Sequence, residues 1–324
     1  MPRKTGFLSA FRAMGCLALL AIAHRTAPAG PLRWEHDMKV DYSSGLAPRW
    51  SGGALLFLEA DLTSQPSIHS FDAEGVGSAV IVTIPEASQI SVYGYSRGLD
   101  GTIAVCGHAL DKQGRQPSFI ALISRSGEST EILRTDPYRA HRVALAPDGT
   151  VWAVGYELTS EGDEPKDVGD KGVIRHLDRS GKQIGAFVKR STLSSPTVVM
   201  WGYLLAARDR VGWYSGPAFG PGSQYVEVSH DGVVSRFSDP QLQAKEHVTG
   251  MAVTDSAGTF VTTYSNEGGS RFLMLDKPRG TWVPADIPVG PQTGPPERLF
   301  GGHGDTLVFA GAEPHRYSLY TVAR

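Results

Sequence analysis

The chain has 324 residues, of which 38 are glycine, 21 are proline and 41% are hydrophobic, a composition typical of many short strands joined by turns. Its formal net charge is -2 with both signs interspersed, which excludes the large basic surface that counterion-driven binding to nucleic acid requires. We therefore expect an all-β protein without a nucleic-acid partner.

Residues 1–29 have the order of a secretory signal peptide. Basic residues between Arg3 and Arg12 precede an apolar run from Cys16 to Ala23, and small residues follow as far as Ala29. The apolar run is too short to cross a bilayer as a helix, so no transmembrane segment is expected after cleavage at Ala23 or Ala29. We predict export to the periplasm or the extracellular space, with a buried N-terminal helix as the alternative interpretation.

Removal of the signal peptide changes the charge and the cysteine count. Four basic residues are lost, so the net charge becomes -2 - 4 = -6. Cys16 is lost as well, which leaves Cys106 alone and excludes an internal disulfide. Cys106 stands in an apolar segment, where it is expected to be a small buried side chain. The exported protein must then be stabilised by its core.

A turn followed by an apolar strand recurs along the rest of the chain. The recurring segments are 48, 48, 61, 48 and 47 positions apart, and they begin at Gly53, Gly101, Gly149, Arg210, Gly258 and Asp305. Each has a short apolar strand before it and a second hairpin after it, which makes four antiparallel strands per unit. This pattern predicts a six-bladed β-propeller. Seven blades with one degenerate blade, and a pair of β-sandwiches, are the alternatives.

The one long interval contains an acidic stretch, residues 157–171, which we interpret as a loop insertion. Its few apolar residues favour a disordered loop. It lacks the regular carboxylate spacing of an EF-hand loop.

The last repeat ends at Arg324 without an outermost strand. The segment Leu32–Val40 is a candidate for that strand. If it pairs there, both ends of the chain share one sheet and the ring has no open edge. Residues 30–324 are then expected to be a single propeller domain.

The segment Ala144–Trp152 resembles the blades of the NHL and SMP-30-like propeller superfamily. The resemblance covers the repeat over most of the mature chain and implies the fold. In SMP-30-like enzymes it would further imply a divalent ion at the channel mouth, held by carboxylate and amide groups. No metal residue is assigned here, because the motif that matches is a structural turn.

Polar residues gather just before three of the innermost strands, where the loops of a propeller form a funnel around its axis. We predict ligand-binding residues at Tyr138, Arg139, His141, Arg142, Glu246, His247, Glu297 and Arg298. The alternative is that these are solvated loop charges.

Two functions remain open. The first is a non-catalytic binding module for an extracytoplasmic protein, peptide or glycan, for which no cofactor is predicted. The second is a divalent-metal hydrolase or lyase that acts on a small ester, lactone or sugar derivative, with Glu246, His247 and Glu297 near the ion. A quinone-cofactor dehydrogenase is disfavoured, since such propellers are larger and use a pair of cysteines.

Overall fold

The computed structural model describes residues 32–44, 46–60, 65–158, 171–193, 202–216, 223–243, 245–256, 258–289, 298–311 and 313–323. The predicted signal peptide and most of the acidic insertion, residues 159–170, lie outside them.

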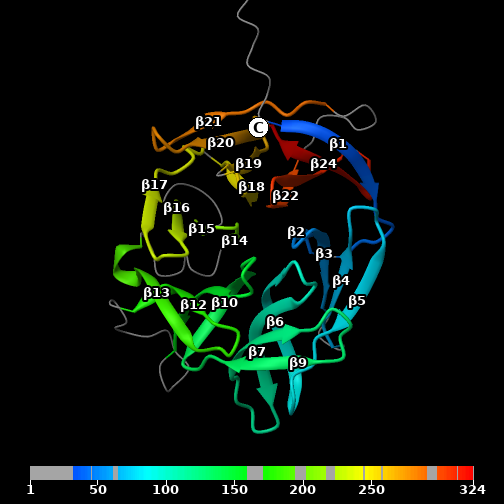
Figure 1. The fold of residues 1–324 in the computed structure, drawn as a ribbon, viewed down its shortest axis with the longest axis vertical. Helices are drawn as coiled ribbons and strands as arrows, with labels where there is room; N and C mark the ends of the chain where they lie inside the picture. The colour runs from blue at the N-terminus through cyan, green and yellow to red at the C-terminus, as the bar shows by residue number, and fades with distance from the viewer. Residues whose placement is uncertain are drawn as a thin grey trace, which may run out of the picture.

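The described strands form six four-stranded antiparallel sheets in a ring, which confirms the six-bladed β-propeller (Figure 1). The innermost strands are β2 (Arg49–Ser51), β6 (Ala87–Arg97), β10 (Tyr138–Leu145), β14 (Tyr203–Ala206), β18 (His247–Val253) and β22 (Arg298–His303). The second strands are β3 (Ala54–Glu59), β7 (Ile103–Asp111), β11 (Val151–Glu157), β15 (Arg210–Ser215), β19 (Thr259–Ser265) and β23 (Thr306–Ala310).

Two outer layers complete the blades. The third strands are β4 (Ser67–Phe71), β8 (Ser118–Ile123), β12 (Gly172–Leu177), β16 (Gln224–Ser229), β20 (Gly269–Asp276) and β24 (Arg316–Val322). The outermost strands are β5 (Gly77–Ile81), β9 (Thr130–Arg134), β13 (Gln183–Lys189), β17 (Val234–Phe237), β21 (Thr281–Pro284) and β1 (Leu32–Lys39). The helical element among the described residues is a 3-10 turn, Arg190–Thr192, and no helix there is long and apolar enough to cross a membrane.

The ring closes through the two ends of the described chain, as predicted. Strand β1 pairs antiparallel with β24, from Leu32 opposite Val322 to Lys39 opposite Arg316. The sixth blade therefore has the order β1-β24-β23-β22 (Figure 1). Its inner strand β22 contacts β2 of the first blade, so the sixth blade packs against the first.

The core lies between the faces of neighbouring blades. Middle strands such as β8 and β15 are buried along their whole length, because a blade packs on each of their faces. Outermost strands such as β17 are mainly exposed. Cys106 is fully buried on β7, as expected for a small apolar side chain, and burial raises the pKa of its thiol to about 12.

The predicted Asp-Gly turns join inner and second strands and also link blades. Gly149 takes a φ of 83°, which glycine adopts without strain, and the Asp148 carboxylate accepts a hydrogen bond of 2.9 Å from the Thr150 amide. In the second blade the equivalent Asp100 forms an ion pair with Arg179 of the third blade at 2.7 Å. The turn of the second blade therefore contacts the third blade.

Candidate functional site

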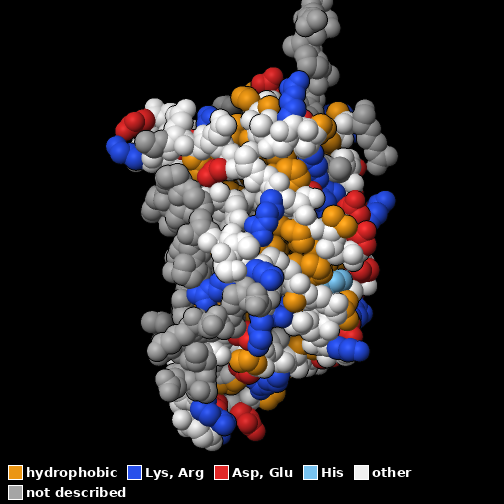
Figure 2. All heavy atoms as spheres, turned by 90° about the vertical axis from the view of Figure 1, so that its left-hand side faces the viewer, with side chains coloured by type: hydrophobic (Ala, Val, Ile, Leu, Met, Phe, Trp, Pro, Cys, Tyr) orange, Lys and Arg blue, Asp and Glu red, His pale blue; other side chains and the backbone are white. Residues whose placement is uncertain are grey.

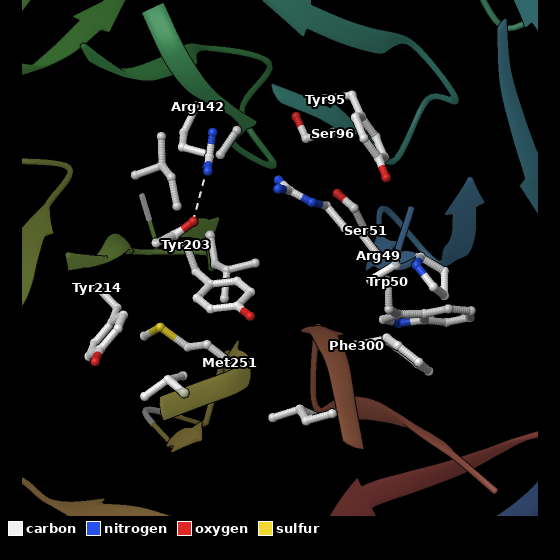
Figure 3. Close-up of a pocket in the computed structure, with 18 of the residues that line it drawn as sticks. Arg49, Trp50, Ser51, Tyr95, Ser96, Arg142, Tyr203, Tyr214, Met251 and Phe300 are labelled. Carbon is white, nitrogen blue, oxygen red and sulfur yellow. Dashed lines mark hydrogen bonds between the residues drawn. The ribbon is translucent and has the colours of Figure 1, made fainter. Parts of the chain in front are cut away.

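A cavity of about 780 Å³ lies where the six blades meet, and all six inner strands contribute to its wall. Much of that wall is aromatic or aliphatic, as Figure 3 shows for Trp50, Tyr95, Tyr203, Met251 and Phe300. Known small-molecule sites enclose roughly 300 to 1,000 Å³ and combine an apolar lining with a few polar groups. This cavity is the candidate site.

Four inner strands carry a β-bulge whose extra residue lines the cavity. The bulged residues are Tyr93 on β6, His141 on β10, Thr249 on β18 and Phe300 on β22. A bulge adds one residue to one strand and re-aims its side chain. The bulges therefore determine which side chains of these strands face the axis.

Glycines let the inner strands approach closely around the cavity. A Cβ atom at Gly250 would lie 1.8 Å from the carbonyl oxygen of Leu299 in the next blade. A Cβ atom at Gly94 would lie 3.0 Å from the Cα atom of Arg142. Both positions follow a bulge directly, so the bulge and the glycine together fit neighbouring blades around the axis.

Positive charge is concentrated in the cavity. Its described lining contains five arginines and a single carboxylate, that of Glu246. The arginines are Arg49, Arg97, Arg139, Arg142 and Arg298. Because low-dielectric walls strengthen the field of like charges, the cavity favours an anion.

On the outer side of the ring that carries β13 and β17, Figure 2 shows lysine and arginine side chains standing among acidic ones.

The Glu246 carboxylate is engaged within the protein. Arg271 donates from Nε to one oxygen at 2.7 Å and from Nη2 to the other at 2.5 Å. Thr263 and the Gln243 amide add further hydrogen bonds. Burial alone would raise the pKa of Glu246, but these donors outweigh it and hold the pKa below its usual value. The carboxylate thus anchors the loop before β18.

His141 is stacked between two tyrosine rings in the wall. The ring centroids of Tyr93 and Tyr156 lie 4.9 and 5.0 Å from that of His141. Burial, reinforced by the charges of Arg142 and Arg139, lowers the pKa of His141 to about 4. His141 is therefore neutral at pH 7, and its Nε2 atom has no hydrogen-bond partner among the described residues.

The structure brings most of the predicted site residues together. The cavity is lined by Arg139, His141, Arg142, Glu246, His247 and Arg298. Tyr138 lies elsewhere, because its hydroxyl donates to the Val173 carbonyl at 2.9 Å and its ring packs under Arg175. Glu297 is outside the described residues. The prediction placed the group just before the innermost strands, whereas Tyr138 through Arg142 belong to β10, His247 to β18 and Arg298 to β22.

The sequence prediction missed a second set of lining residues. It comprises Arg49, Trp50, Tyr95, Tyr203 and Phe300. A signal for part of it was present, because a glycine inside a strand often marks a bulge. Such a glycine follows the bulged residue in Tyr93-Gly94, Thr249-Gly250 and Phe300-Gly301.

Comparison with known proteins reveals similarity in the fold alone. No family model and no curated protein matches the chain. Among solved structures, a Mycobacterium tuberculosis puromycin-hydrolyzing peptidase is 14% identical with a TM-score of 0.43, over 80% of this chain and 42% of that one. A prolyl endopeptidase is 11% identical with a TM-score of 0.49, over 86% and 41%. The chain thus spans about two fifths of these peptidases.

A third solved structure covers a similar share of both proteins. A gluconolactonase from Xanthomonas campestris is 12% identical with a TM-score of 0.45, over 85% of each chain. At these identities the likeness concerns the propeller alone, and the blade count follows from the strand pairing described above.

Proposed function

We propose that this propeller is an exported, non-catalytic binding module that takes one group of a protein, peptide or glycan into its central cavity. The observation that carries the proposal is the lining of that cavity, in which five arginines face a single carboxylate that Arg271 already neutralises. A folded protein rarely keeps uncompensated like charges together unless a partner completes them. The apolar wall around the arginines supplies contact area for such a partner.

The described residues do not fit the divalent ion that the SMP-30-like resemblance implies. No group of three or more His, Cys, Asp or Glu side chains among them has a metal-holding arrangement. Glu246, the carboxylate of the described lining, is held by Arg271 and Thr263. The described part of the chain therefore offers a metal-dependent hydrolase or lyase, acting on a small ester, lactone or sugar derivative, no group of three side chains that could hold its ion.

The binding function is tested by closing the cavity. Val248 is half-buried in the wall, and Val248→Trp places an indole there. The matched control is Val234→Trp, because Val234 is 39% exposed on the outermost strand β17. The full chain, purified after export, is screened by thermal shift against acidic peptides, uronate oligosaccharides and neutral oligosaccharides.

We expect stabilisation of the parent and of Val234→Trp by an acidic class, and its loss in Val248→Trp. If Val248→Trp does not fold, Leu242→Trp at the same cavity replaces it. Equal stabilisation of the parent and of the variant with a tryptophan in the cavity would rule out the cavity as the binding site. A shift produced by calcium, manganese or zinc alone would instead support the hydrolase.

Export is tested separately on the same preparation. Intact mass measurement of the secreted protein should show a mature N-terminus after Ala29 or Ala23. Recovery of protein that retains Met1 from the cytoplasm of the same host would contradict export. It would not affect the proposal that the cavity binds a ligand.

A further inference from the structure

Arg142 holds its guanidinium in one position near the centre of the cavity wall. Its Nε donates to the Gly202 carbonyl at 2.9 Å, and its Nη1 donates to the carbonyls of Tyr93 at 3.0 Å and His141 at 2.6 Å. These acceptors come from three successive blades, and Figure 3 shows the first of the bonds as a dashed line. Nη2 has no partner among the described residues, so two N–H groups remain for a ligand.

Arg49 approaches Arg142 from the first blade. Its guanidinium lies over the Tyr95 ring, 5.1 Å from the centroid, and makes no hydrogen bond or ion pair within the described chain. Figure 3 shows the side chain extending from β2 into the space on the side of Arg142. Two guanidinium groups that repel each other thus face one region without a carboxylate between them.

A third donor group stands at the same region. Tyr203 on β14 lines the same cavity as Arg298, whose Nε donates to the Thr249 carbonyl at 3.1 Å (Figure 3 shows Tyr203). Burial raises the pKa of the Tyr203 hydroxyl, while the charges of Arg298, Arg49 and Arg142 act on it in the opposite sense. The three arginines therefore converge electrostatically on Tyr203.

Apolar surface adjoins these donors. Trp50, Phe300, Met251 and Tyr214 line the same cavity, from four different blades (Figure 3). The buried Nε1 atom of Trp50 has no acceptor among the described residues. A ligand that offers an oxygen acceptor and an apolar body would satisfy both features at once.

We propose that Arg49, Arg142 and Tyr203 form a subsite for an oxyanion, the carboxylate or phosphate of an organic ligand whose aromatic or aliphatic body packs on Trp50 and Phe300. This subsite rests on the proposed binding function and names the group that enters the cavity. The planar forks of two guanidinium groups suit the oxygens of either anion. A neutral ligand would leave the two arginine charges unmatched.

Simple probes test the subsite on the full chain. They are 3-phenylpropionate, phenyl phosphate and the neutral 3-phenylpropanol, and binding is measured by titration calorimetry. The variants are Arg49→Gln and Arg49→Lys, since the described contact of the Arg49 guanidinium is with the Tyr95 ring and its loss should leave the fold intact. Arg115→Gln is the matched control, because Arg115 is exposed and pairs with Asp111 on a distant loop.

We expect an anionic probe to bind the parent and Arg115→Gln, and the neutral alcohol to bind at least about ten-fold more weakly. Arg49→Gln should lose about ten-fold in affinity for the anion, Arg49→Lys should recover part of it, and added salt should weaken binding. Preference for phenyl phosphate identifies a phosphate ligand, and preference for 3-phenylpropionate a carboxylate. Equal affinity for the alcohol, or no effect of Arg49→Gln, overturns the subsite.

The two proposals fail in different ways. If a peptide or glycan binds and Val248→Trp blocks it while Arg49→Gln does not, the binding function stands and the oxyanion subsite is wrong. If Val248→Trp leaves the binding of every ligand unchanged, the binding function of the cavity is wrong.

Discussion

Two groups of arginines in this ring differ in how their charge is balanced. Between the fourth and fifth blades, Arg210 donates to the buried carboxylate of Glu227, which also accepts from Lys277 at 2.7 Å. Tyr225 and Thr259 donate to the same carboxylate at 2.8 and 3.0 Å. In the cavity, the guanidinium groups of Arg49 and Arg142 have only carbonyls and a ring as described neighbours.

The contrast separates charge that is balanced within the described chain from charge that is not. The Glu227 network satisfies its members, and the donors offset the effect of burial so that the pKa of Glu227 lies below its usual value. No described carboxylate forms an ion pair with Arg49 or Arg142 in the cavity. A group that is complete in the folded chain should stabilise it, whereas an incomplete group should cost stability until its partner binds.

The largest expected effect is the loss of the Glu227 carboxylate. Glu227→Gln removes the carboxylate that buried Arg210 and half-buried Lys277 share, and it leaves Arg210 only the exposed Asp209 as a counter-charge. We expect a loss of about 3–5 kcal/mol in the free energy of unfolding. Urea denaturation measures it, with the exposed Glu131→Gln as the control. A loss no greater than that of the control would erase the distinction between the two groups.

Lowering the pH should destabilise the folded protein through protonation of His141. The pKa of His141 is lowered from 6.5 to about 4, mainly by burial and then by Arg142, Arg139 and His108. Between these pH values the unfolded chain binds a proton that the folded chain does not, so stability falls as the pH falls through this window, by at most about 3 kcal/mol. His141→Phe should flatten that part of the curve when urea denaturation is repeated from pH 7 to pH 4. An unchanged slope would show that His141 does not titrate this way.

Replacing Arg49 in the cavity and replacing Arg210 beside Glu227 should change the free energy of unfolding in opposite directions. Without ligand, Arg49→Gln relieves repulsion with Arg142, whose pKa is lowered to about 10 by burial and then by Arg49. We expect a gain of about 0.5–1 kcal/mol in the free energy of unfolding. Arg210→Gln should lower it, because Glu227 loses a partner. Thermal melts of the two variants, measured side by side, test this expectation. A shift of the melting temperature in the same direction in both would contradict the difference between the two groups of arginines.

The smallest effect is expected at the blade-linking ion pair of Arg179 and Asp100. Both side chains are at least half exposed, so water screens the pair. Arg179→Gln should change the free energy of unfolding by less than about 0.5 kcal/mol. A larger loss in urea denaturation would mean that water does not screen this pair as its exposure predicts.

The fold was predictable because its signals are local and repeated. Asp-Gly turns such as Asp148-Gly149 and the near-constant spacing of the second strands determine the number of blades. The shortened last repeat likewise indicated that Leu32–Lys39 completes the ring. Each turn lies within a few residues along the chain and recurs at a near-constant interval, so one sequence suffices to recognise the repeat.

The site was predictable only in part, because it depends on which face of an inner strand each residue occupies. A single bulge at His141 changes the alternation along β10, so that Arg139, His141 and Arg142 all reach the cavity. Tyr138, one position away, packs into the blade instead. Arg49 was missed because its strand, β2, has only three residues, which are too few for an alternation to be recognised in the sequence.

The seam between β1 and β24 also determines how the ring responds to force. Leu32 lies opposite Val322 and Lys39 opposite Arg316, so both chain ends leave the ladder at the same end. Tension applied to these ends would open the hydrogen bonds one after another, as in a zip, rather than shear them all at once. Mechanical unfolding should therefore begin in the sixth blade, whose inner strand β22 carries Arg298 of the cavity.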